Sequence, residues 1–592
     1  MPFLADGIDD EDEVLTAVAG ALGDLVPHVG GPGHAAALLG PLELLLAVEA
    51  NAVREAAAAS ALAVSQQMSD MEYEAAFVGM IGRLAVKEWF TARISACRLV
   101  PPAYPRMMAT SRTKHLRHFA ALCQDDAPMV RRIAARHLGP LLYAVAEDGG
   151  PAVLEENGAI AGILLGLYEA LAGGDQPDSV RLHTTQNCVE FGRAMGLLSG
   201  QRPLGSASPT IPATPSPRVD CLVHRVLPLV VATIDDRSWR VRWTAASRFA
   251  AVVDAFAPLS GAMDALVPAY EKLLQDPEAE VRTAAALNLS AVARTGVDVL
   301  PAGWSGTPGD SEGDDGRRVP VAHRLVKRVL ALTEDDSESV RAALASVATD
   351  LAPLLGKDLT IVHLLPPLLL LLRDATAEVR LNIVTSLSLL HDSIGTELLT
   401  QSLLPAVLDL AEDGKWRIRL AVIERIPLLA RQLGKEFFAE RLLALCVGWL
   451  SDAISSIRAA AAANLKELTS LLGAEWAVQH LLPRVKGVTE DPSYLRRMHA
   501  VRALTLMGTA MDVRTAQWEV LPLLLEAYGD PVPNVRFNVA RGLGSLGPMF
   551  GSTVYQGQIT PVLEVLKEDP DRDVRYFANE SSDLLSAEFE KR

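Results

Sequence analysis

The chain has 592 residues, of which 49% are hydrophobic and only 5% aromatic, and its formal net charge is −17. A chain rich in Ala and Leu and poor in aromatic residues favours packed helices over sheets. The acidic balance argues against a nucleic-acid binder, which normally has a basic face, and favours protein partners with basic surfaces.

The N-terminal segment, 1–13, is acidic and lacks the basic start and apolar run of a signal peptide. The longest apolar stretch, 364–372, is broken by two prolines and is far shorter than the ~20 residues that span a bilayer. We therefore expect no membrane span. The five cysteines form no CxxC pair, which predicts reduced, buried thiols and a cytoplasmic, and also nuclear, location. They are Cys97, Cys123, Cys188, Cys221 and Cys446.

One phrase recurs along the chain: an acidic residue, a few polar residues, Val-Arg or Ile-Arg, and an Ala/Leu-rich run. An opening unit stands at 12–15, and the next copies are marked by Arg54, Arg93 and Arg131, in steps of 39 and 38 along the chain. Self-similarity at a fixed period is the signature of a repeat array. We therefore expect 1–199 to consist of N-terminal repeats.

The step lengthens to 50 between Arg131 and Arg181 and to 61 between Arg181 and Arg242. We assign the first excess to 147–158 and the second to a Pro/Ser-rich insertion at 200–217. Both are polar and turn-forming, which predicts surface loops. The second contains three residues that proline-directed kinases could modify, adding negative charge, although an inert insertion is the simpler interpretation. They are Ser208, Thr214 and Ser216.

Central repeats follow at 218–301, and a Gly/Asp-rich insertion at 302–318 explains the long step from Arg282 to Arg341. The last segment, 319–592, is the most regular, because its arginines recur at a constant step of 39. They are Arg341, Arg380, Arg419, Arg458, Arg497, Arg536 and Arg575, with a degenerate copy at 491–497. Thirteen arginine-marked copies and the opening unit make fourteen repeats.

Each repeat is predicted to be two helices joined by a turn, for example 359–372 and 379–390 with the turn at 373–378. Asp374 is placed to cap the second helix, which contributes about 0.5–2 kcal/mol. Arg380 lies in the first turn of that helix, where its charge is unfavourable. We therefore expect a ladder of Arg–Asp pairs between neighbouring repeats, since the planar guanidinium suits a carboxylate.

A period of about 40 residues with two helices is typical of HEAT repeats, in which stacking buries the apolar face that one pair leaves exposed. The expected fold is an all-α HEAT-repeat superhelical solenoid of about fourteen helix pairs. Tryptophans in the polar turns at Trp239 and Trp416, and the tyrosine at Tyr494, are typical of interface anchors. Local packing remains the alternative for all three.

Several strings make a family resemblance specific over essentially the whole chain. They are 9–15 (DDEDEVL), 89–93 (WFTAR), 125–132 (DDAPMVRR), 238–242 (SWRVR), 378–383 (EVRLNI), 401–419 (QSLLPAVLDLAEDGKWRIR) and 529–540 (GDPVPNVRFNVA). In these strings the chain resembles the scaffolding A subunits of protein phosphatase 2A. The family usually has fifteen repeats, and this chain begins inside what corresponds to the second.

The resemblance implies a non-catalytic scaffold of a serine/threonine phosphatase holoenzyme, with no cofactor. It implies that the turns of the last repeats bind the catalytic subunit, through Lys415, Trp416, Arg417, Tyr494, Val532 and Asn534. It also implies that N-terminal turns bind interchangeable regulatory B-type subunits, through Glu49, Trp89, Asp126, Pro128, Arg131, Arg132 and Trp239. Ser455 stands where the family has an aromatic residue. From the residues alone, Arg131 is explained better by the ladder, and Asp126 and Pro128 by turn chemistry.

Two further motifs carry no site. The glycines of 541–547 match GxGxxG, but they fall at the end of a second helix, with no strand before them. His115 and His118 have helical spacing without a third metal ligand, so a solvated helix face is the expected explanation, and we expect no metal.

Two rivals to the scaffold remain. A HEAT adaptor of the nuclear-transport type would bind a small GTPase or cargo signals and no phosphatase. An enzyme such as a HEAT-like chromophore lyase needs a pocket with a nucleophile or an acid/base pair, and the sequence supplies no candidate for either.

Overall fold

The computed structural model describes residues 11–155, 158–198, 217–257, 262–295, 321–386 and 404–591, together with positions 259, 390 and 393. All regular structure in this part of the chain is helical, which confirms the all-α prediction. The predicted insertions at 200–217 and 302–318 lie outside it except for residue 217, as do Ser208, Thr214, Ser216 and the side chain of Cys221.

The chain divides into two compact units, Met1–Leu332 and Thr333–Arg592. The α-helices of the first unit are α2 (Asp12–Leu22), α3 (Leu39–Leu45), α4 (Asn51–Gln66), α5 (Asp70–Glu72), α6 (Gly79–Ala85), α7 (Phe90–Ala103), α8 (Ala109–Cys123), α9 (Pro128–Gly149), α10 (Leu165–Ala172), α11 (Asp178–Arg181), α12 (Thr184–Leu198), α13 (Pro217–Ile234), α14 (Trp239–Phe256), α15 (Ala262–Leu273), α16 (Ala279–Leu287), α17 (Leu289–Thr295) and α18 (Val321–Thr333). Its 3-10 or π segments are η2 (Val26–Val29), η3 (Pro32–Leu38), η4 (Tyr73–Val78), η5 (Tyr104–Arg106), η6 (Gly150–Leu154) and η7 (Ala159–Leu164).

The second unit has the α-helices α19 (Glu338–Val347), α20 (Ala352–Leu359), α21 (Leu365–Leu372), α22 (Ala377–Ser386), α25 (Leu404–Ala411), α26 (Trp416–Leu433), α27 (Lys435–Arg441), α28 (Leu443–Gly448), α29 (Ser455–Leu472), α30 (Ala474–Trp476), α31 (Leu482–Thr489), α32 (Tyr494–Gly508), α33 (Val513–Thr515), α34 (Leu521–Glu526), α35 (Pro533–Leu546), α36 (Ser552–Val554), α37 (Thr560–Lys567) and α38 (Arg572–Lys591). Its short segments are η8 (Ala348–Leu351), η9 (Thr360–Leu364), η12 (Trp449–Ser451), η13 (Ala477–Leu481), η14 (Ala516–Val520), η15 (Ala527–Gly529), η16 (Gly547–Met549) and η17 (Tyr555–Ile559).

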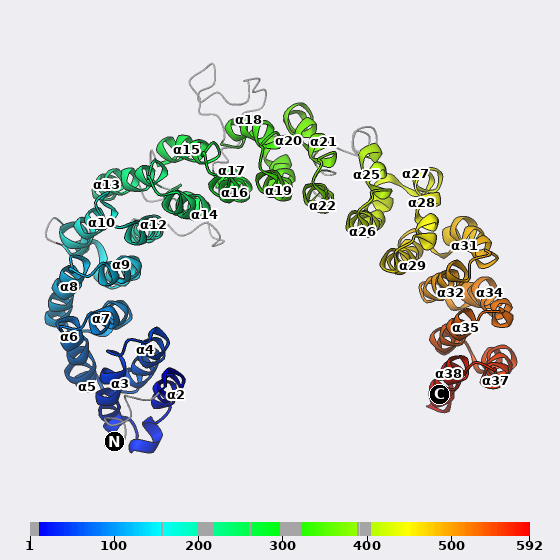
Figure 1. Cartoon of the computed structure of the whole chain (residues 1–592), viewed down its shortest axis with the longest axis horizontal. Coiled ribbons are helices and arrows are strands. Elements are labelled where there is room, and N and C mark those ends of the chain that lie inside the picture. Colours follow the sequence, from blue (N-terminus) through cyan, green and yellow to red (C-terminus); the bar gives the residue numbers. More distant parts are fainter. Residues whose placement is uncertain are drawn as a thin grey trace. The chain divides into compact units, whose positions relative to one another are not determined.

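Within each unit the helices form two layers (Figure 1). Successive second helices pack side by side: α4, α7, α9, α12, α14 and α16 in the first unit, and α19, α22, α26, α29, α32, α35 and α38 in the second. The first helices of the repeats form the other layer. The core lies between the layers, so each repeat buries the face that its neighbour would otherwise expose.

The apolar residue before each repeat arginine anchors its second helix in this core. It is at most 1% exposed in eight regular copies, and burying such a side chain contributes roughly 1.5–3 kcal/mol. The eight are Val241, Val281, Val340, Val379, Ile418, Ile457, Val535 and Val574. The recurring Val-Arg phrase therefore combines a core anchor with a polar partner at the surface.

The repeat around Asp374 confirms two helices and corrects their bounds. The second helix, α22, begins at Ala377 rather than at position 379. Asp374 accepts a hydrogen bond from the N–H of Thr376 at 2.7 Å, so it closes the turn and does not cap the N–H groups of the helix itself. Because this turn is tight, the helix starts earlier in the sequence than predicted.

The first helices contain wide π turns followed by proline. Pro366, Pro483, Pro522 and Pro561 each stand in the first two positions of an α-helix that directly follows a π segment. Proline has no N–H to donate and clashes with the preceding turn of a regular helix, and a π turn is one local change that accommodates it. Periodicity in the sequence alone does not reveal these wide turns.

Glycines at repeat junctions in the second unit adopt positive φ. Gly434 and Gly473, with φ of 84° and 99°, follow the second helices α26 and α29 and precede the next first helix. Gly356 has φ 74° and separates α19 from the first helix of the next repeat. Only glycine adopts this backbone readily.

The stretch Glu338–Leu372 is long and apolar enough to meet a length and composition criterion for a membrane span. Gly356 interrupts it with non-helical φ and ψ, and its two halves belong to neighbouring repeats. A helix interrupted in this way does not present the continuous span of ~20 residues that a bilayer requires.

The structure tests two other sequence predictions, the loop at 147–158 and the buried cysteines. The excess assigned to a loop at 147–158 is partly helical, because α9 continues to Gly149 and η6 follows directly. Cys97, Cys123, Cys188 and Cys446 are free and buried, as predicted. Burial raises the pKa of each of these thiols, so they are held in the unreactive neutral form.

Candidate functional site: the turns between paired helices

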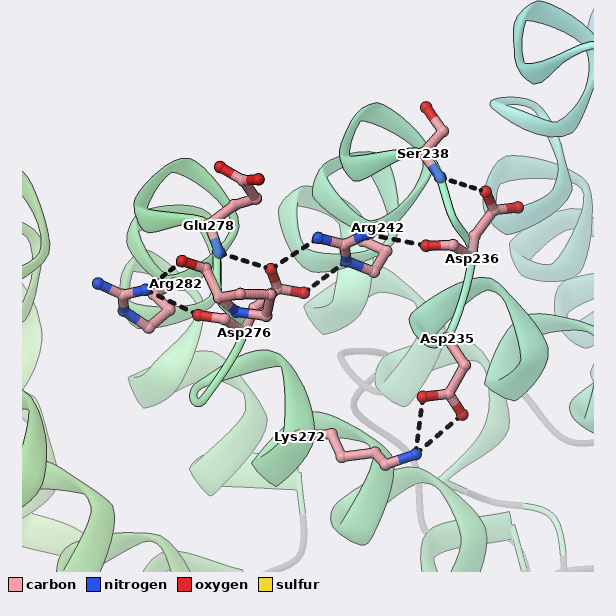
Figure 2. Close-up of polar contacts among 9 residues, drawn as sticks. Asp235, Asp236, Ser238, Arg242, Lys272, Asp276, Glu278 and Arg282 are labelled. Atoms are coloured by element: carbon pink, nitrogen blue, oxygen red, sulfur yellow. Dashed lines mark hydrogen bonds and ion pairs between the residues drawn. The ribbon is translucent and has the colours of Figure 1, made fainter.

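A repeated arrangement of arginine and aspartate organises the turns between paired helices (Figure 2). Arg242 donates from Nε and Nη2 to the two carboxylate oxygens of Asp276 in the next repeat, at 2.7 and 3.0 Å. Its Nη1 donates to the carbonyl of Asp236 in its own turn at 2.8 Å. Asp276 in turn accepts from the N–H of Glu278 at 2.9 Å. One arginine thus ties two turns together.

We call each such inter-repeat Arg–Asp pair a rung. The predicted ladder is confirmed for eight such pairs among the described residues. They are Arg93–Asp125, Arg181–Asp236, Arg242–Asp276, Arg341–Asp374, Arg380–Asp413, Arg419–Asp452, Arg497–Asp530 and Arg536–Asp569. Their side chains are largely buried, so the pairs are poorly screened by solvent.

Two rungs near the C-terminus show how the pairing keeps a carboxylate ionised. The Arg536 guanidinium, 2.7 Å from Asp569, holds the pKa of that carboxyl below its ordinary value, against burial, which raises it. In Asp530 burial again raises the pKa, but hydrogen bonds from Arg497 and from the N–H of Val532 outweigh it, so the pKa is lowered. These two rungs therefore persist over the whole physiological pH range.

One rung of the second unit is open. Arg458 donates from Nη1 to the carbonyls of Asp452 and Ala453 at 2.7 and 2.9 Å, but its buried Nε has no hydrogen-bond partner. Asp491, the carboxylate that the period places opposite Arg458, is bound at 3.0 Å by Arg496 of its own turn. The degenerate copy in the sequence is thus the place where the ladder of the second unit is interrupted.

The residues that the resemblance assigns to catalytic-subunit binding lie on turns or first helical turns of the second unit. Lys415, Arg417, Tyr494 and Asn534 are exposed, whereas Trp416 and Val532 are half-buried. The Arg417 guanidinium lies 4.7 Å from the centre of the Trp416 ring, a cation–π distance. These side chains leave charged and aromatic groups facing away from the core on three turns.

The residues assigned to regulatory subunits lie on turns of the first unit. Glu49, Asp126, Pro128 and Arg132 are exposed, and Trp89 and Trp239 keep 55% and 38% of their surface exposed. Burying so large an apolar ring against a partner is favourable, so exposed tryptophans mark interaction surfaces. Arg131 differs, because it donates to the side chain of Gln176 and to the carbonyls of Asp125 and Asp126. It belongs structurally to the ladder.

Some exposed apolar side chains near these turns were not predicted from the sequence. Trp243 is 44% exposed one helical turn after Trp239 on α14, and Ile454 and Tyr528 flank the turns of the second unit. The i, i+4 spacing of the two tryptophans was a signal for one shared face. Together they make the α14 end the most aromatic exposed surface among the described residues of the first unit.

The histidine pair and the glycine-rich motif both have structural roles. His115 is not on a solvated face: it is 2% exposed, and its ring nitrogens contact the carbonyls of Ser111 and Val78. The glycines of 541–547 lie in α35 and η16, with no strand in the described residues before them. A Cβ on Gly542 or Gly544 would come within 2.5 Å of Thr505 or Ser581, so these glycines serve close helix packing.

Comparison with known proteins gives a family match and relatives. The family model described as PIK3R4-like, middle domain, matches residues 215–540. The chain is 39% identical over 366 residues to the beta isoform of the 65 kDa regulatory A subunit of serine/threonine-protein phosphatase 2A from Homo sapiens, covering 62% of this chain and 53% of the relative. It is 38% identical over 259 residues to the regulatory A subunit of protein phosphatase PP2A from Schizosaccharomyces pombe, covering 44% and 38%. A probable PP2A regulatory subunit of Caenorhabditis elegans is 41% identical over 190 residues, covering 32% and 30%. The aligned parts thus span about half or less of these relatives.

Solved structures show the fold at low sequence identity. A Kap121p–Pho4p complex matches with a TM-score of 0.60 at 13% identity, covering 98% of this chain and 56% of that chain. A Kap95p complex with RanGDP matches with a TM-score of 0.57 at 13% identity, covering 94% and 67%. These karyopherins support a HEAT-like solenoid.

Proposed function

The chain belongs to the family described as PIK3R4-like, middle domain, and we propose that it is a non-catalytic scaffold of a protein phosphatase 2A holoenzyme. The observation that carries the proposal is its 38–41% identity to proteins named as regulatory subunits, among them A subunits, of that phosphatase. The exposed aromatic and charged residues on its turns give a scaffold the means to bind partners. Cytoplasm and nucleus are the proposed locations.

In this proposal the catalytic subunit binds to the second unit, and a regulatory subunit of the B type binds to the first unit. Trp416 with Arg417, Tyr494 and the turn at Val532 provide the first surface. Trp239, Trp89 and the exposed Arg132 provide the second. Holding both partners on one chain raises their effective concentration for one another. Because each repeat contacts only its neighbours, bending distributed along the array lets regulators of different shape be accepted.

The test uses the full chain as bait in a pull-down from a cell extract, with serine/threonine phosphatase activity measured on the retained material. Trp416→Ala should reduce retained activity about 30-fold or more, the equivalent of losing a hot spot of about 2 kcal/mol. Trp518→Ala is the matched control, because Trp518 is 68% exposed but lies on a first helix, away from the turns.

Trp239→Ala should leave phosphatase activity on the bait and release the regulatory subunit, which a blot for that subunit measures. No retained activity on wild-type bait would contradict the proposal. Retention of a small GTPase instead would favour the rival of nuclear-transport type, for which the Kap95p and Kap121p neighbours are a fold-level likeness only.

A further inference from the structure

Three consecutive second helices of the first unit bring cationic side chains together outside the ladder. Arg132 and Arg136 lie on α9, His183 immediately precedes α12, and Arg248 lies on α14. The three arginines are exposed and His183 is half-buried. We call these four residues the basic cluster. Only Arg132 belongs to the surface predicted from the sequence.

The packing of α9 against α12 places the first three members side by side. Asn187 of α12 donates from Nδ2 to the carbonyl of Ala135 at 2.9 Å and accepts from the N–H of Gly139 at 3.1 Å. The two helices run in the same direction, because Gln176, which precedes α12, meets Arg131 near the start of α9. His183, one turn before Asn187, therefore lies beside the turn of α9 that carries Arg132 and Arg136.

Arg248 approaches the same place from the other side. Its Nη1 donates to the side-chain oxygen of Gln186, which lies in the first turn of α12, soon after His183. Burial and then the positive charges of Arg132, Arg136 and Arg248 lower the pKa of His183 to about 4. All three guanidinium groups are thus close enough to act on one imidazole.

The cluster has little compensating negative charge. Arg132 and Arg136 form no ion pair within the described parts of the chain, and the partner of Arg248 is a neutral amide. The neighbouring carboxylate of Glu190 accepts from Gln186 at 2.6 Å and lies 3.6 Å from Arg193. Like charges at i, i+4 are unfavourable on a helix. In a chain with a net charge of −17, a cationic cluster with so few acidic neighbours is therefore unexpected from folding alone.

We propose that the basic cluster binds an acidic segment of a partner polypeptide, laid in extended form across α9, α12 and α14. Packed helices are about 8–10 Å apart. An extended chain of the polyproline II type has three residues per turn and advances about 3.1 Å per residue, so residues three apart lie on one side of it, about 9 Å from each other. Carboxylates three residues apart would therefore meet successive helices, and each guanidinium fork suits a carboxylate. Duplex nucleic acid carries a charge about every 1.7 Å, which four separated groups match poorly.

The test is a fluorescence-anisotropy titration of the full chain with a labelled peptide of about twelve residues that has Glu at every third position, which places the carboxylates on one side of a polyproline II chain. A second peptide with Gln at those positions is the neutral probe. The acidic peptide alone should bind, and raising salt from about 50 to about 200 mM should weaken it. Arg136→Glu and Arg248→Glu should each weaken binding about ten-fold or more.

Arg514→Glu is the matched control, because Arg514 is exposed in the second unit and the charge change is the same. Arg248→Gln repeats the test with a milder change if a charge reversal unfolds the chain, which circular dichroism would show. Equal binding of both peptides, or unchanged affinity in the cluster variants, would overturn the proposal. Tighter binding of a single-stranded oligonucleotide than of the acidic peptide would overturn it in favour of nucleic acid.

This inference extends the first unit's role and stands apart from phosphatase binding. Arg136→Glu should still retain phosphatase activity in the pull-down, because the surface around Trp416 is untouched. Loss of peptide binding with retained phosphatase activity separates the two functions. Peptide binding by a chain that retains no phosphatase would keep the basic cluster and remove the scaffold proposal.

Discussion

Two neighbouring rungs of the second unit differ although the period is the same on both sides. Arg497 reaches both oxygens of Asp530, at 2.6 and 2.9 Å, and the rung is closed. Arg458, one repeat earlier, leaves its Nε unpartnered while Asp491 turns to Arg496. Both repeats contain the arginine and the aspartate, so the presence of these two residues does not ensure that they form an ion pair.

The difference lies in the repeat that supplies the carboxylate, at the position five residues after the aspartate and directly before that repeat's own arginine. In regular copies it is an apolar anchor, such as Val535, which is 1% exposed. In the turn that supplies Asp491, the carboxylate of the open rung, the same place holds Arg496, which is exposed and offers Asp491 a partner within that turn. A single cationic residue in a core position thus removes an anchor and redirects a carboxylate. Whether two repeats are tied depends on this local competition.

The largest effect is expected from Asp530→Ala. It leaves the buried guanidinium of Arg497 without its carboxylate, which should lower the local free energy of opening by about 3 kcal/mol. Asp491→Ala removes only a solvent-screened ion pair and a hydrogen bond within the turn. It should therefore lower the local free energy of opening much less. Native-state hydrogen exchange of α32 and α35 measures the free energy of opening in both variants. An equal decrease in the two variants would contradict the difference between the closed and the open rung.

A smaller effect of opposite sign is expected from Arg496→Val. The change restores the apolar anchor and frees Asp491 to close the rung with Arg458. Protection of α29 and α32 against hydrogen exchange should rise roughly five-fold. Arg496→Gln frees the carboxylate without supplying the anchor and so separates the two contributions. Unchanged protection in both variants would show that Arg496 does not hold the rung open.

The smallest effect concerns pH. Burial, and then the charges of Arg458 and Arg502, lower the pKa of His499 from 6.5 to about 4. Its charged form is disfavoured in the folded state, so its contribution to stability is complete above pH 6.5 and is lost as pH falls towards 4. The rung carboxylates of Asp530 and Asp569 titrate lower, with pKa values below their ordinary 3.8.

His499→Gln should therefore reduce the fall in melting temperature between pH 6.5 and 4 by about 1 °C. The effect is small because the shift in melting temperature caused by one group decreases with chain length. Thermal unfolding of the wild type and the variant across this range measures it. An unaltered pH profile in His499→Gln would contradict the lowered pKa of this histidine, because a group with that shift must contribute to the fall in stability over this range.

The ladder was predictable because its chemistry repeats with the chain. A carboxylate and a guanidinium at fixed positions in each period lead directly to a pair between neighbours, as in Arg341–Asp374. The exceptions were not predictable in the same way. Gln176 replaces the carboxylate for Arg131, since the extra residues before α11 change the turn, and a count of periods cannot show which side chain then meets the arginine.

The candidate surfaces also include one part that could be predicted from the sequence and one that could not. Trp239 and Trp416 stood out because a tryptophan in a polar turn is conspicuous in the sequence. The basic cluster did not, because Arg136, His183 and Arg248 come from three repeats separated by insertions, and only the packing of α9, α12 and α14 brings them together. His115 was misjudged because helical spacing alone does not reveal which face the next helix covers.

The junction glycines have a consequence for how such a chain could change its length. Gly434 and Gly473 stand one full period apart, and both precede a first helix with nearly the same backbone conformation. Unequal exchange between the two codons would delete or duplicate one whole module and rejoin the chain at an equivalent glycine. After such a deletion Arg419 would face Asp491. The deletion would therefore change the contacts between neighbouring repeats and leave the fold within each repeat unchanged.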